Sequence, residues 1–354
     1  MKNLFRSDGA SRRGAVICGA YGMHNAGDDA VLSAIRSALR RLDETIPLTV
    51  IARGGRRTGQ AGGMAGVSRL NAFGWLRAMG RARLFILGGG SLLQDVTSRR
   101  SLGYYLLLLR AAKAMGCATM LYGIGAGPIL REAGRRRAAE YLNAYADVIS
   151  ARDRDSLDTL RAWGVTKPRL LLGADPALSL PAAGGERERK AGFILRAWPS
   201  FWTHVPEFAQ AVRYVYEQYR LPPAFFCLAP EDRQAVKSVC AELEGVPCAV
   251  SADPRRVGRM AVVLSMRLHG LVFALRDEVP AAGISYDPKV DAFCKEAGFP
   301  LLALEDVTAE GLRELADFAM RMDGEHLSAS ARTLRARERT NLSAAAELLA
   351  PDGD

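Results

Sequence analysis

The chain has 354 residues, of which 49% are hydrophobic and 24% are charged, and a chain of this length can bury the cores of two ordinary globular domains. Its formal net charge is +10, but the excess consists mostly of arginines spread along the sequence, without the basic and aromatic platform or the known module of a nucleic-acid-binding protein. We therefore expect a globular protein of two domains and exclude nucleic acid as a partner.

The sequence lacks the patterns of export and of membrane insertion. Residues 1–13 are charged and have no apolar core of the length that a signal peptide needs. The longest apolar stretch, residues 102–129, is interrupted by Arg110, Lys113 and several glycines, so it is too polar to cross a bilayer. We expect a cytoplasmic protein.

Two arginine-rich runs, residues 53–57 and 135–137, are candidates for peripheral contact with the inner face of an anionic membrane. The alternative is that both form an ordinary solvated surface. The six cysteines are scattered, without the close pairing of a zinc site or a disulfide scaffold, and no other set of metal ligands stands out. We therefore expect reduced thiols, no metal and no cofactor.

The first half of the chain alternates between apolar runs typical of buried strands and amphipathic stretches typical of helices. Helical patterns occupy residues 28–42, 101–115 and 153–163. The strand-like runs are residues 15–20, 48–51, 84–87, 118–122, 148–151 and 169–172. This alternation predicts a parallel, doubly wound sheet, so residues 1–182 are expected to form one α/β domain.

Residues 183–191 are polar and rich in glycine and charge, which is typical of a linker. Strand-like runs follow at residues 192–195, 224–228, 248–251, 261–264 and 279–284, again with helices between them. We predict a second α/β domain over residues 192–328, and a helix within residues 329–354 that packs back on the first domain. The expected fold class is α/β, with two Rossmann-like doubly wound domains facing across a cleft as in GT-B enzymes.

A glycine-rich segment, residues 19–28, lies between the first strand and the first helix, where backbone amides approach a ligand. The spacing of its glycines differs from the dinucleotide-binding pattern G-x-G-x-x-G. Asn25 and Asp28 can hydrogen-bond sugar hydroxyls, and the Asp28 carboxylate can act as a general base. The alternative is structural, with glycines that form a turn and Asp28 at the start of a helix.

Two further glycine-rich segments, residues 88–91 and 123–128, follow the third and fourth strands at the same edge of the sheet. Glycine lets a ligand approach the main chain closely, and nearby polar side chains can bind a polar ligand. The candidate ligand contacts here are Gly89, Gly90, Ser91 and Gln94. Glycines also close strand-to-helix turns that bind nothing, which is the structural alternative.

Cationic side chains follow two strands of the second domain. Arg267 and His269 lie in the turn after one strand, and Lys289 lies beyond the next. Guanidinium binds planar oxyanions bidentately, an ammonium acts as a point charge, and an imidazole transfers protons. The cluster predicts a site for a substrate that bears both carboxylate and phosphate. The alternatives are a structural ion pair, a capping histidine and a solvated lysine.

These segments, in this order, resemble the polysaccharide pyruvyl transferase family. The C-terminal pair, Ser265-Met-Arg-Leu-His-Gly270 and Ile284-Ser-Tyr-Asp-Pro-Lys-Val290, is similar to the signature of its bacterial cell-wall branch, the CsaB type. The matching segments in the first half are residues 19–30, 88–95, 123–128 and 150–153. The resemblance covers all but the extreme ends of the chain.

The resemblance implies an enzyme that moves pyruvate from phosphoenolpyruvate onto two hydroxyls of one sugar, forming a cyclic ketal and releasing phosphate. In this scheme His269 is the general acid and Asp28 is a candidate base for the acceptor hydroxyl. The acceptor sugar is bound by Asn25, Gly89, Gly90, Ser91 and Gln94. Arg152, which aligns with a family arginine, binds phosphoenolpyruvate together with Arg267 and Lys289. An imidazolium also binds phosphate, so His269 and Arg267 can exchange these duties.

The same resemblance implies a lipid-linked acceptor, an N-acetylmannosamine-type sugar of a secondary cell-wall polymer whose ketal anchors surface-layer proteins. Two alternatives remain open. The first is a GT-B glycosyltransferase that uses a nucleotide sugar, with Arg267 and Lys289 on the diphosphate, although no clear acidic motif in the second domain is placed to hold a ribose. The second is a noncatalytic sugar-binding protein of the same fold.

Overall fold

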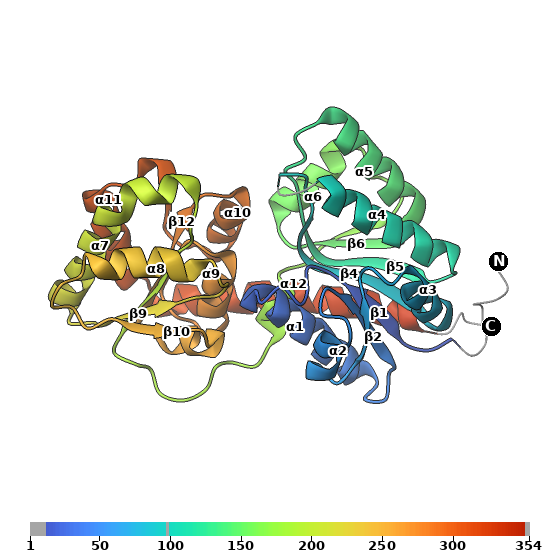
Figure 1. Ribbon diagram of the computed structural model, residues 1–354, viewed down its shortest axis with the longest axis horizontal. Coiled ribbons are helices and arrows are strands. Elements are labelled where there is room, and N and C mark those ends of the chain that lie inside the picture. The colour runs from blue at the N-terminus through green and yellow to red at the C-terminus, as the bar shows by residue number, and fades with distance from the viewer. Residues whose placement is uncertain (1–11, 97–98, 351–354) are drawn as a thin grey trace. The chain divides into compact units, whose positions relative to one another are not determined.

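The computed structural model describes residues 12–96 and 99–350, which form two compact units (Figure 1). Unit 1 comprises residues 12–24, Asp28–Leu180 and residues 335–350, and unit 2 comprises Asn25–Gly27 and Pro181–Leu334. Both units are built on parallel sheets with helices between the strands, which confirms the predicted α/β class.

Unit 1 is built on a seven-stranded parallel sheet in the order β3-β2-β1-β4-β5-β6-β7. The strands are β1 (Ala15–Cys18), β2 (Leu48–Ala52), β3 (Ala65–Ser68), β4 (Leu84–Leu93), β5 (Ala118–Ala126), β6 (Val148–Ala151) and β7 (Arg169–Leu172). Because β1 pairs with both β2 and β4, the winding of the chain reverses direction at β1. Ligands of doubly wound sheets bind outside the carboxyl ends of the strands at this switch point.

Helices cover both faces of the unit 1 sheet. They are α1 (Ala26–Leu42), α2 (Arg56–Ala61), α3 (Ala72–Arg81), α4 (Arg99–Ala114), α5 (Glu132–Tyr145), α6 (Arg154–Ala162) and the C-terminal part of α12 (Gly324–Leu349). Helices α3 to α6 lie on one face of the sheet and α1 on the other (Figure 1). Apolar residues of α3 to α6 share one core with the sheet, and those of α1 and α12 share a second core. Val31, Ile35 and Leu39 of α1 recur at helical spacing and are buried, as the amphipathic pattern predicted.

The two glycine-rich segments that were predicted to follow the third and fourth strands lie wholly or partly within those strands. β4 continues to Leu93 and β5 to Ala126, with an irregular register between Gly90 and Leu93. Gly89 and Gly90 have φ of 62° and 73°, a conformation that glycine adopts without strain. The strands therefore run further toward the candidate site than their apolar residues indicate.

The helix α2 and the edge strand β3 were not predicted from the sequence. The strand residues Ala65–Ser68 are partly exposed and include Gly66, so they lack the continuous apolar run of a buried strand. The helix Arg56–Ala61 includes Gly59, whose α-carbon packs against the backbone of Gly66. Glycine in both elements permits this close approach and weakens the sequence pattern of each.

The final helix α12 begins at Gly324, before the predicted start at residue 329. Its residues from Arg335 onward belong to unit 1, where Ala344 and Ala345 are buried in the core. The amide of Asn341 donates to the carbonyl of Ala174 at 3.0 Å, and its Oδ1 accepts from the hydroxyl of Ser150. The last turns of the chain are thus fixed on unit 1 by both apolar and polar contacts.

Unit 2 is built on a six-stranded parallel sheet in the order β10-β9-β8-β11-β12-β13. The strands are β8 (Ala191–Ile194), β9 (Pro223–Phe226), β10 (Ala249–Ser251), β11 (Val262–Ser265), β12 (Ala281–Ser285) and β13 (Leu301–Ala303). The helices are α7 (Val205–Tyr219), α8 (Asp232–Ala241), α9 (Leu268–Arg276), α10 (Pro288–Ala297) and α11 (Ala309–Met320). The edge strand β13 was not predicted, because its three residues give too short an apolar run.

Helices also cover both faces of the unit 2 sheet. Apolar residues of α7, α8 and α11 share a core with one face. On the other face, Gly270 of α9 lies against Ile194, and Gly283 of β12 lies against Cys294 of α10. Both units are therefore doubly wound.

Residues 183–191, predicted as a linker, are bound to unit 2. The guanidinium of Arg187 donates to the carbonyls of Asp277 and Glu278 at 2.8 and 3.0 Å, and Glu188 forms an ion pair with Arg256 at 2.8 Å. The charged composition that suggested a solvated linker instead reflects side chains that pair with groups of this unit.

Among the described residues, no helix is both long enough and apolar enough to cross a membrane.

Candidate functional site

Arg152 directly follows β6 at the carboxyl edge of the unit 1 sheet and is buried, with 4% of its surface exposed. Its Nε donates to the carboxylate of Asp153 at 3.2 Å, and Asp153 in turn caps α6 by accepting from the backbone N–H of Ser156 at 2.7 Å. A guanidinium bonded to a capping carboxylate has a fixed orientation.

Gly125 of β5 gives Arg152 the room that it occupies. A Cβ at Gly125 would lie 2.7 Å from Nη2 of Arg152 and 3.1 Å from the Oγ of Ser91. Ser91, a predicted acceptor contact, and Arg152, a predicted donor contact, therefore approach the same glycine from neighbouring strands. The structure brings these two candidates together.

Asp28 lies in the first turn of α1, beside the backbone of Gly90. Its Oδ1 is 3.6 Å from the position that a Cβ of Gly90 would take, so the carboxylate faces bare main chain. At Gly89 a Cβ would overlap the side chain of Val31, because α1 packs closely on β4 there. Asp28, Gly89 and Gly90 are thus neighbours at the switch point between β1 and β4.

The two remaining acceptor candidates, Gln94 and Asn25, belong to different units. Gln94 follows β4 and is half-buried. Asn25 belongs to unit 2, where its Oδ1 accepts from the backbone N–H of Gly27 at 3.0 Å and the N–H of Ala26 donates to the carbonyl of Leu228 at 2.8 Å. The sequence analysis placed Asn25 in the first domain, but the segment Asn25–Gly27 groups with the second.

Arg267 is the N-cap residue of α9 and is buried against two carboxylates that the sequence analysis did not consider. Its Nε donates to Oδ1 of Asp232 at 3.0 Å, and Nη2 donates to Glu231 at 2.7 Å and to Asp232. Burial alone disfavours the charged guanidinium, but the charge and hydrogen bonds of Asp232 outweigh it and raise the pKa of Arg267. Arg267 therefore stays protonated, with its charge balanced by protein carboxylates.

His269 lies in the first turn of α9, where its imidazole packs on the α-carbon of Gly27. A Cβ at Gly27 would overlap the imidazole Nδ1, so only glycine fits at that position. The ring is also 6.1 Å from that of Phe273, one turn along the helix. The glycine-rich segment after β1 thus contacts the histidine of the C-terminal motif within unit 2.

Lys289 lies in the first turn of α10, whose N-cap is Asp287. Its Nζ donates to the carboxylate of Asp287 at 2.8 Å and lies 5.9 Å from the centre of the Tyr286 ring. The Lys289 side chain is 24% exposed, so solvent reaches it. Lys289 is therefore accessible to an anion, although it already pairs with a carboxylate.

A fourth cation, Arg196, lies at this edge of the unit 2 sheet and was missed. It follows β8, which pairs with β11, and its backbone N–H donates to the sulfur of Met266 at 3.3 Å. Its guanidinium carbon is 4.8 Å from the centre of the Tyr286 ring and 5.3 Å from that of Trp198, and Nη1 donates to the Tyr286 hydroxyl. The signal that selected Arg267, a cation just beyond a strand, applies equally to Arg196.

The acidic pair Glu231 and Asp232 bears on the expectation that no clear acidic motif in the second domain is placed to hold a ribose. These residues lie at the start of α8, after β9, and pair with Arg267. Asp232 is fully buried and Glu231 has half of its side chain exposed. A turn separates both residues from the predicted strand, so their place at the edge of the sheet could not be recognised from the sequence.

Within residues 12–96 and 99–350, no group of three or more His, Cys, Asp or Glu side chains is arranged to hold a metal ion.

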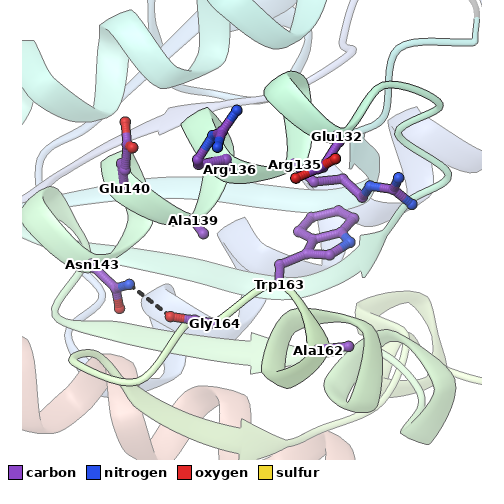
Figure 2. A pocket seen from close by; sticks show the side chains of 9 residues that line it. All are labelled: Glu132, Arg135, Arg136, Ala139, Glu140, Asn143, Ala162, Trp163 and Gly164. Atoms are coloured by element: carbon purple, nitrogen blue, oxygen red, sulfur yellow. Dashed lines mark hydrogen bonds between the residues drawn. The ribbon is translucent and has the colours of Figure 1, made fainter.

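A solvent-open cavity of about 400 Å³ lies on unit 1 between α5 and the end of α6, lined by Arg135, Glu140 and Trp163 among others. Figure 2 shows that Arg135 and Glu132 lie above the Trp163 ring, while Asn143 bonds Gly164 on the other side. None of the predicted site residues lines this cavity.

The family model described as Polysaccharide pyruvyl transferase matches residues 25–243, which is more than half of the chain. The chain belongs to the polysaccharide pyruvyl transferase family. It is therefore a transferase, and pyruvyl transfer to a polysaccharide is its family-level activity. The match includes Asp28, Arg152 and Arg196 but ends before the segment that holds Arg267, His269 and Lys289. A search of curated proteins found no match to this transferase.

Solved structures with a similar fold are enzymes of the GT-B type. A putative UDP-N-acetylglucosamine 2-epimerase from Listeria monocytogenes is 13% identical with a TM-score of 0.65, covering 94% of each chain. The UDP-GlcNAc 2-epimerase from Neisseria meningitidis, bound to UDP-GlcNAc, is 12% identical with a TM-score of 0.62, covering 95% of this chain and 98% of its own. The glycotransferase of kitacinnamycin has 12% identity and a TM-score of 0.55, with 96% and 98% covered. These likenesses confirm the GT-B-like fold.

Proposed function

We propose that this transferase moves pyruvate from phosphoenolpyruvate onto two hydroxyls of one sugar and forms a cyclic ketal. The main support is the set of basic residues at the carboxyl edge of the unit 2 sheet, where Arg267 and Lys289 follow adjacent strands and His269 lies in the first turn of α9, two residues after Arg267. A substrate with one carboxylate and one phosphate suits such a set. Family membership supplies the reaction class.

The proposed reaction begins with protonation of the methylene carbon of phosphoenolpyruvate, which places positive charge on the adjacent carbon. One sugar hydroxyl attacks that carbon, phosphate leaves, and the second hydroxyl closes the ketal. Of the two hydroxyl protons lost by the sugar, one balances the new methyl group and the other departs with phosphate. His269 is the proposed acid, and Asp28 is the proposed base toward the acceptor.

Unit 1 supports the acceptor part of the proposal. Asp28 faces the bare backbone of Gly90, and Ser91 lies beside Gly125, so hydroxyl-binding groups and open main chain occur together at the switch point. We also retain Gly89, Gln94 and Asn25 as proposed acceptor contacts. We retain Arg152 as a proposed phosphoenolpyruvate residue, because it is a buried and oriented cation.

We also propose that the protein acts in the cytoplasm on a lipid-linked saccharide of a cell-wall polymer, as the CsaB type does. The ketal would place a carboxylate on that polymer and serve surface-layer anchoring. The arginines of residues 53–57 support peripheral contact with an anionic membrane, since Arg53, Arg56 and Arg57 all lie on the protein surface.

The proposal is tested by measuring phosphate release from phosphoenolpyruvate by the purified protein, with and without an acceptor that contains N-acetylmannosamine. We expect release that depends on the acceptor and is lost in His269→Ala. Release without acceptor, or equal release by the variant, would contradict the assignment.

A glycosyltransferase that uses a nucleotide sugar is the second candidate. The half-exposed Glu231 favours it, because a carboxylate at the edge of the second sheet can bind ribose hydroxyls. Against it, Glu231 already accepts a hydrogen bond from Arg267. Calorimetric titration with UDP-N-acetylglucosamine separates the two, since pyruvyl transfer predicts binding of phosphoenolpyruvate and no binding of the nucleotide sugar.

A further inference from the structure

Unit 2 presents three basic side chains at the carboxyl edge of its sheet that differ in how their charge is balanced. Arg267 donates to Asp232 and Glu231, and Lys289 donates to Asp287. Arg196 donates through Nη1 to the neutral hydroxyl of Tyr286, and it forms no ion pair with a carboxylate in residues 12–96 and 99–350. Its charge is therefore the one that protein carboxylates leave available to a ligand.

The guanidinium of Arg196 also has an N–H group that is available to a ligand. Its Nε is buried and has no hydrogen-bond partner within the described part of the chain. An unsatisfied buried donor of this kind costs on the order of 1–3 kcal/mol, so a folded protein usually supplies a partner. A ligand oxyanion would satisfy this N–H group.

Two aromatic rings orient the guanidinium of Arg196 without neutralising its charge. Its guanidinium carbon lies 4.8 Å from the centre of the Tyr286 ring and 5.3 Å from that of Trp198, and the two rings are 4.7 Å apart. Cation–π contacts of this kind orient a guanidinium while leaving N–H groups to accept an anion. Burial raises the pKa of Tyr286, so its hydroxyl remains a neutral partner for Nη1.

The position of Arg196 matches that of the predicted donor residues. β8 and β11 are neighbours in register at Ile194 and Ser265, so Arg196 emerges from the sheet beside Met266 and Arg267. Burial raises the pKa of Glu231, but the hydrogen bond and charge of Arg267, together with the charge of Arg196, outweigh burial and lower this pKa. The Tyr286 ring, finally, is shared by Arg196 and Lys289.

We propose that Arg196 is the principal oxyanion-binding residue of the donor site in unit 2, bound to the phosphate or carboxylate of phosphoenolpyruvate, and that Arg267 acts as a positioning residue. The proposal rests on the proposed pyruvyl transfer for the identity of the donor. Tyr286 and Trp198 orient the guanidinium of Arg196 before the ligand binds. The guanidinium of Arg267 is instead occupied by its hydrogen bonds to the Asp232 carboxylate.

The test is calorimetric titration of the full-length protein with inorganic phosphate, pyruvate and phosphoenolpyruvate. We expect Arg196→Gln to weaken phosphoenolpyruvate binding by about tenfold or more, which is the effect of losing a hydrogen bond to a charged group. Arg196→Lys should retain part of the affinity, because it keeps the charge without the planar fork. The loss should recur with phosphate or with pyruvate, and this identifies which oxyanion the guanidinium binds.

Arg313→Gln is the matched control, because Arg313 is also stacked on a tyrosine of unit 2, at 5.7 Å from the centre of the Tyr214 ring, but it lies on α11. It should bind all three ligands as the wild type does. Thermal unfolding of each variant separates lost binding from lost folding. In kinetic assays, Arg196→Lys should raise the KM for phosphoenolpyruvate and leave the KM for the acceptor unchanged.

The outcomes distinguish this inference from the proposed function. If the wild type binds phosphate through Arg196 but does not bind phosphoenolpyruvate, the donor assignment fails and the oxyanion site stands. If folded Arg196→Gln binds phosphoenolpyruvate as tightly as the wild type does, or if the wild type binds none of the three ligands, the role of Arg196 is wrong.

Discussion

The imidazole of His269 rests on the α-carbon of Gly27, so two segments far apart in the sequence share one contact within unit 2. The glycine belongs to the segment after β1 and the histidine to the motif after β11. A side chain at position 27 would overlap Nδ1 of the imidazole. The orientation of the proposed acid thus depends on a glycine for which the sequence predicted a ligand-approaching loop or a turn, and no contact with His269.

Gly27→Ala should therefore displace His269 and lower the rate of pyruvyl transfer by about tenfold or more, because small errors in the position of a catalytic group are costly. Gly103→Ala in α4 is the control, since a Cβ there meets nothing within 4 Å. The control should keep full activity. An active Gly27→Ala enzyme would show that the packing of His269 on Gly27 does not govern catalysis.

The buried pair of Arg267 and Asp232 should dominate the stability of this part of unit 2. Asp232→Ala leaves a buried guanidinium without its main partner, so we expect a loss of about 3–5 kcal/mol in the free energy of unfolding. Glu231→Ala removes the half-exposed partner and should cost no more than about 1 kcal/mol. Urea unfolding followed by tryptophan fluorescence measures both. Equal losses would contradict the assignment of Asp232 as the main partner.

The fold and the candidate residues were predicted from the sequence to different extents. Buried strands such as Leu84–Leu87 carry a continuous apolar run, so parallel strands and the α/β class were recognisable. The edge strands β3 and β13 lack that run and were missed. Gly89 and Gly90 were predicted to follow the strand, but with positive φ angles both residues continue β4.

The contacts between side chains could not be predicted from the sequence. The partners of Arg267 lie on α8, more than thirty positions away, and spacing along the chain gives no sign of them. Arg196 was passed over because it stands alone in the sequence, whereas Arg267 and His269 occur together. Tyr286, although part of the C-terminal motif, and Trp198 were assigned no role, because an aromatic residue in the sequence does not reveal which guanidinium it contacts.

Stability should depend on pH through Glu338, a buried residue of α12 whose Oε1 accepts a hydrogen bond from Tyr122 at 3.4 Å. Burial raises the pKa of Glu338 to about 7, above its ordinary value of 4.5. The folded protein then binds a proton that the unfolded chain has lost, so stability should fall as the pH rises from about 4.5 to about 7 and change no further above that range.

Glu338→Gln keeps the shape and removes the titration. Its melting temperature should exceed that of the wild type above about pH 7, and the difference should shrink toward about pH 4.5. Thermal unfolding over this pH range makes the comparison. A wild type and variant that lose stability in parallel would exclude Glu338 as the titrating group.

The role of His269 can be separated from its charge. If the imidazole donates the proton to the methylene carbon, His269→Gln should remove one limb of the pH profile of kcat and leave weak residual activity. If it serves only as a cation, the glutamine variant should be inactive at every pH. We expect the first result, measured as phosphate release across the pH range in which the enzyme is folded.

The most direct test of pyruvyl transfer is identification of the product. Purified enzyme, phosphoenolpyruvate and a saccharide containing N-acetylmannosamine should give an acceptor whose mass has increased by that of pyruvate less one water, with one phosphate released per ketal, as measured by mass spectrometry and a phosphate assay. The account predicts that both signals depend on the acceptor and disappear in His269→Ala. An acceptor of unchanged mass, or one that gains a sugar from UDP-N-acetylglucosamine under the same conditions, would contradict it.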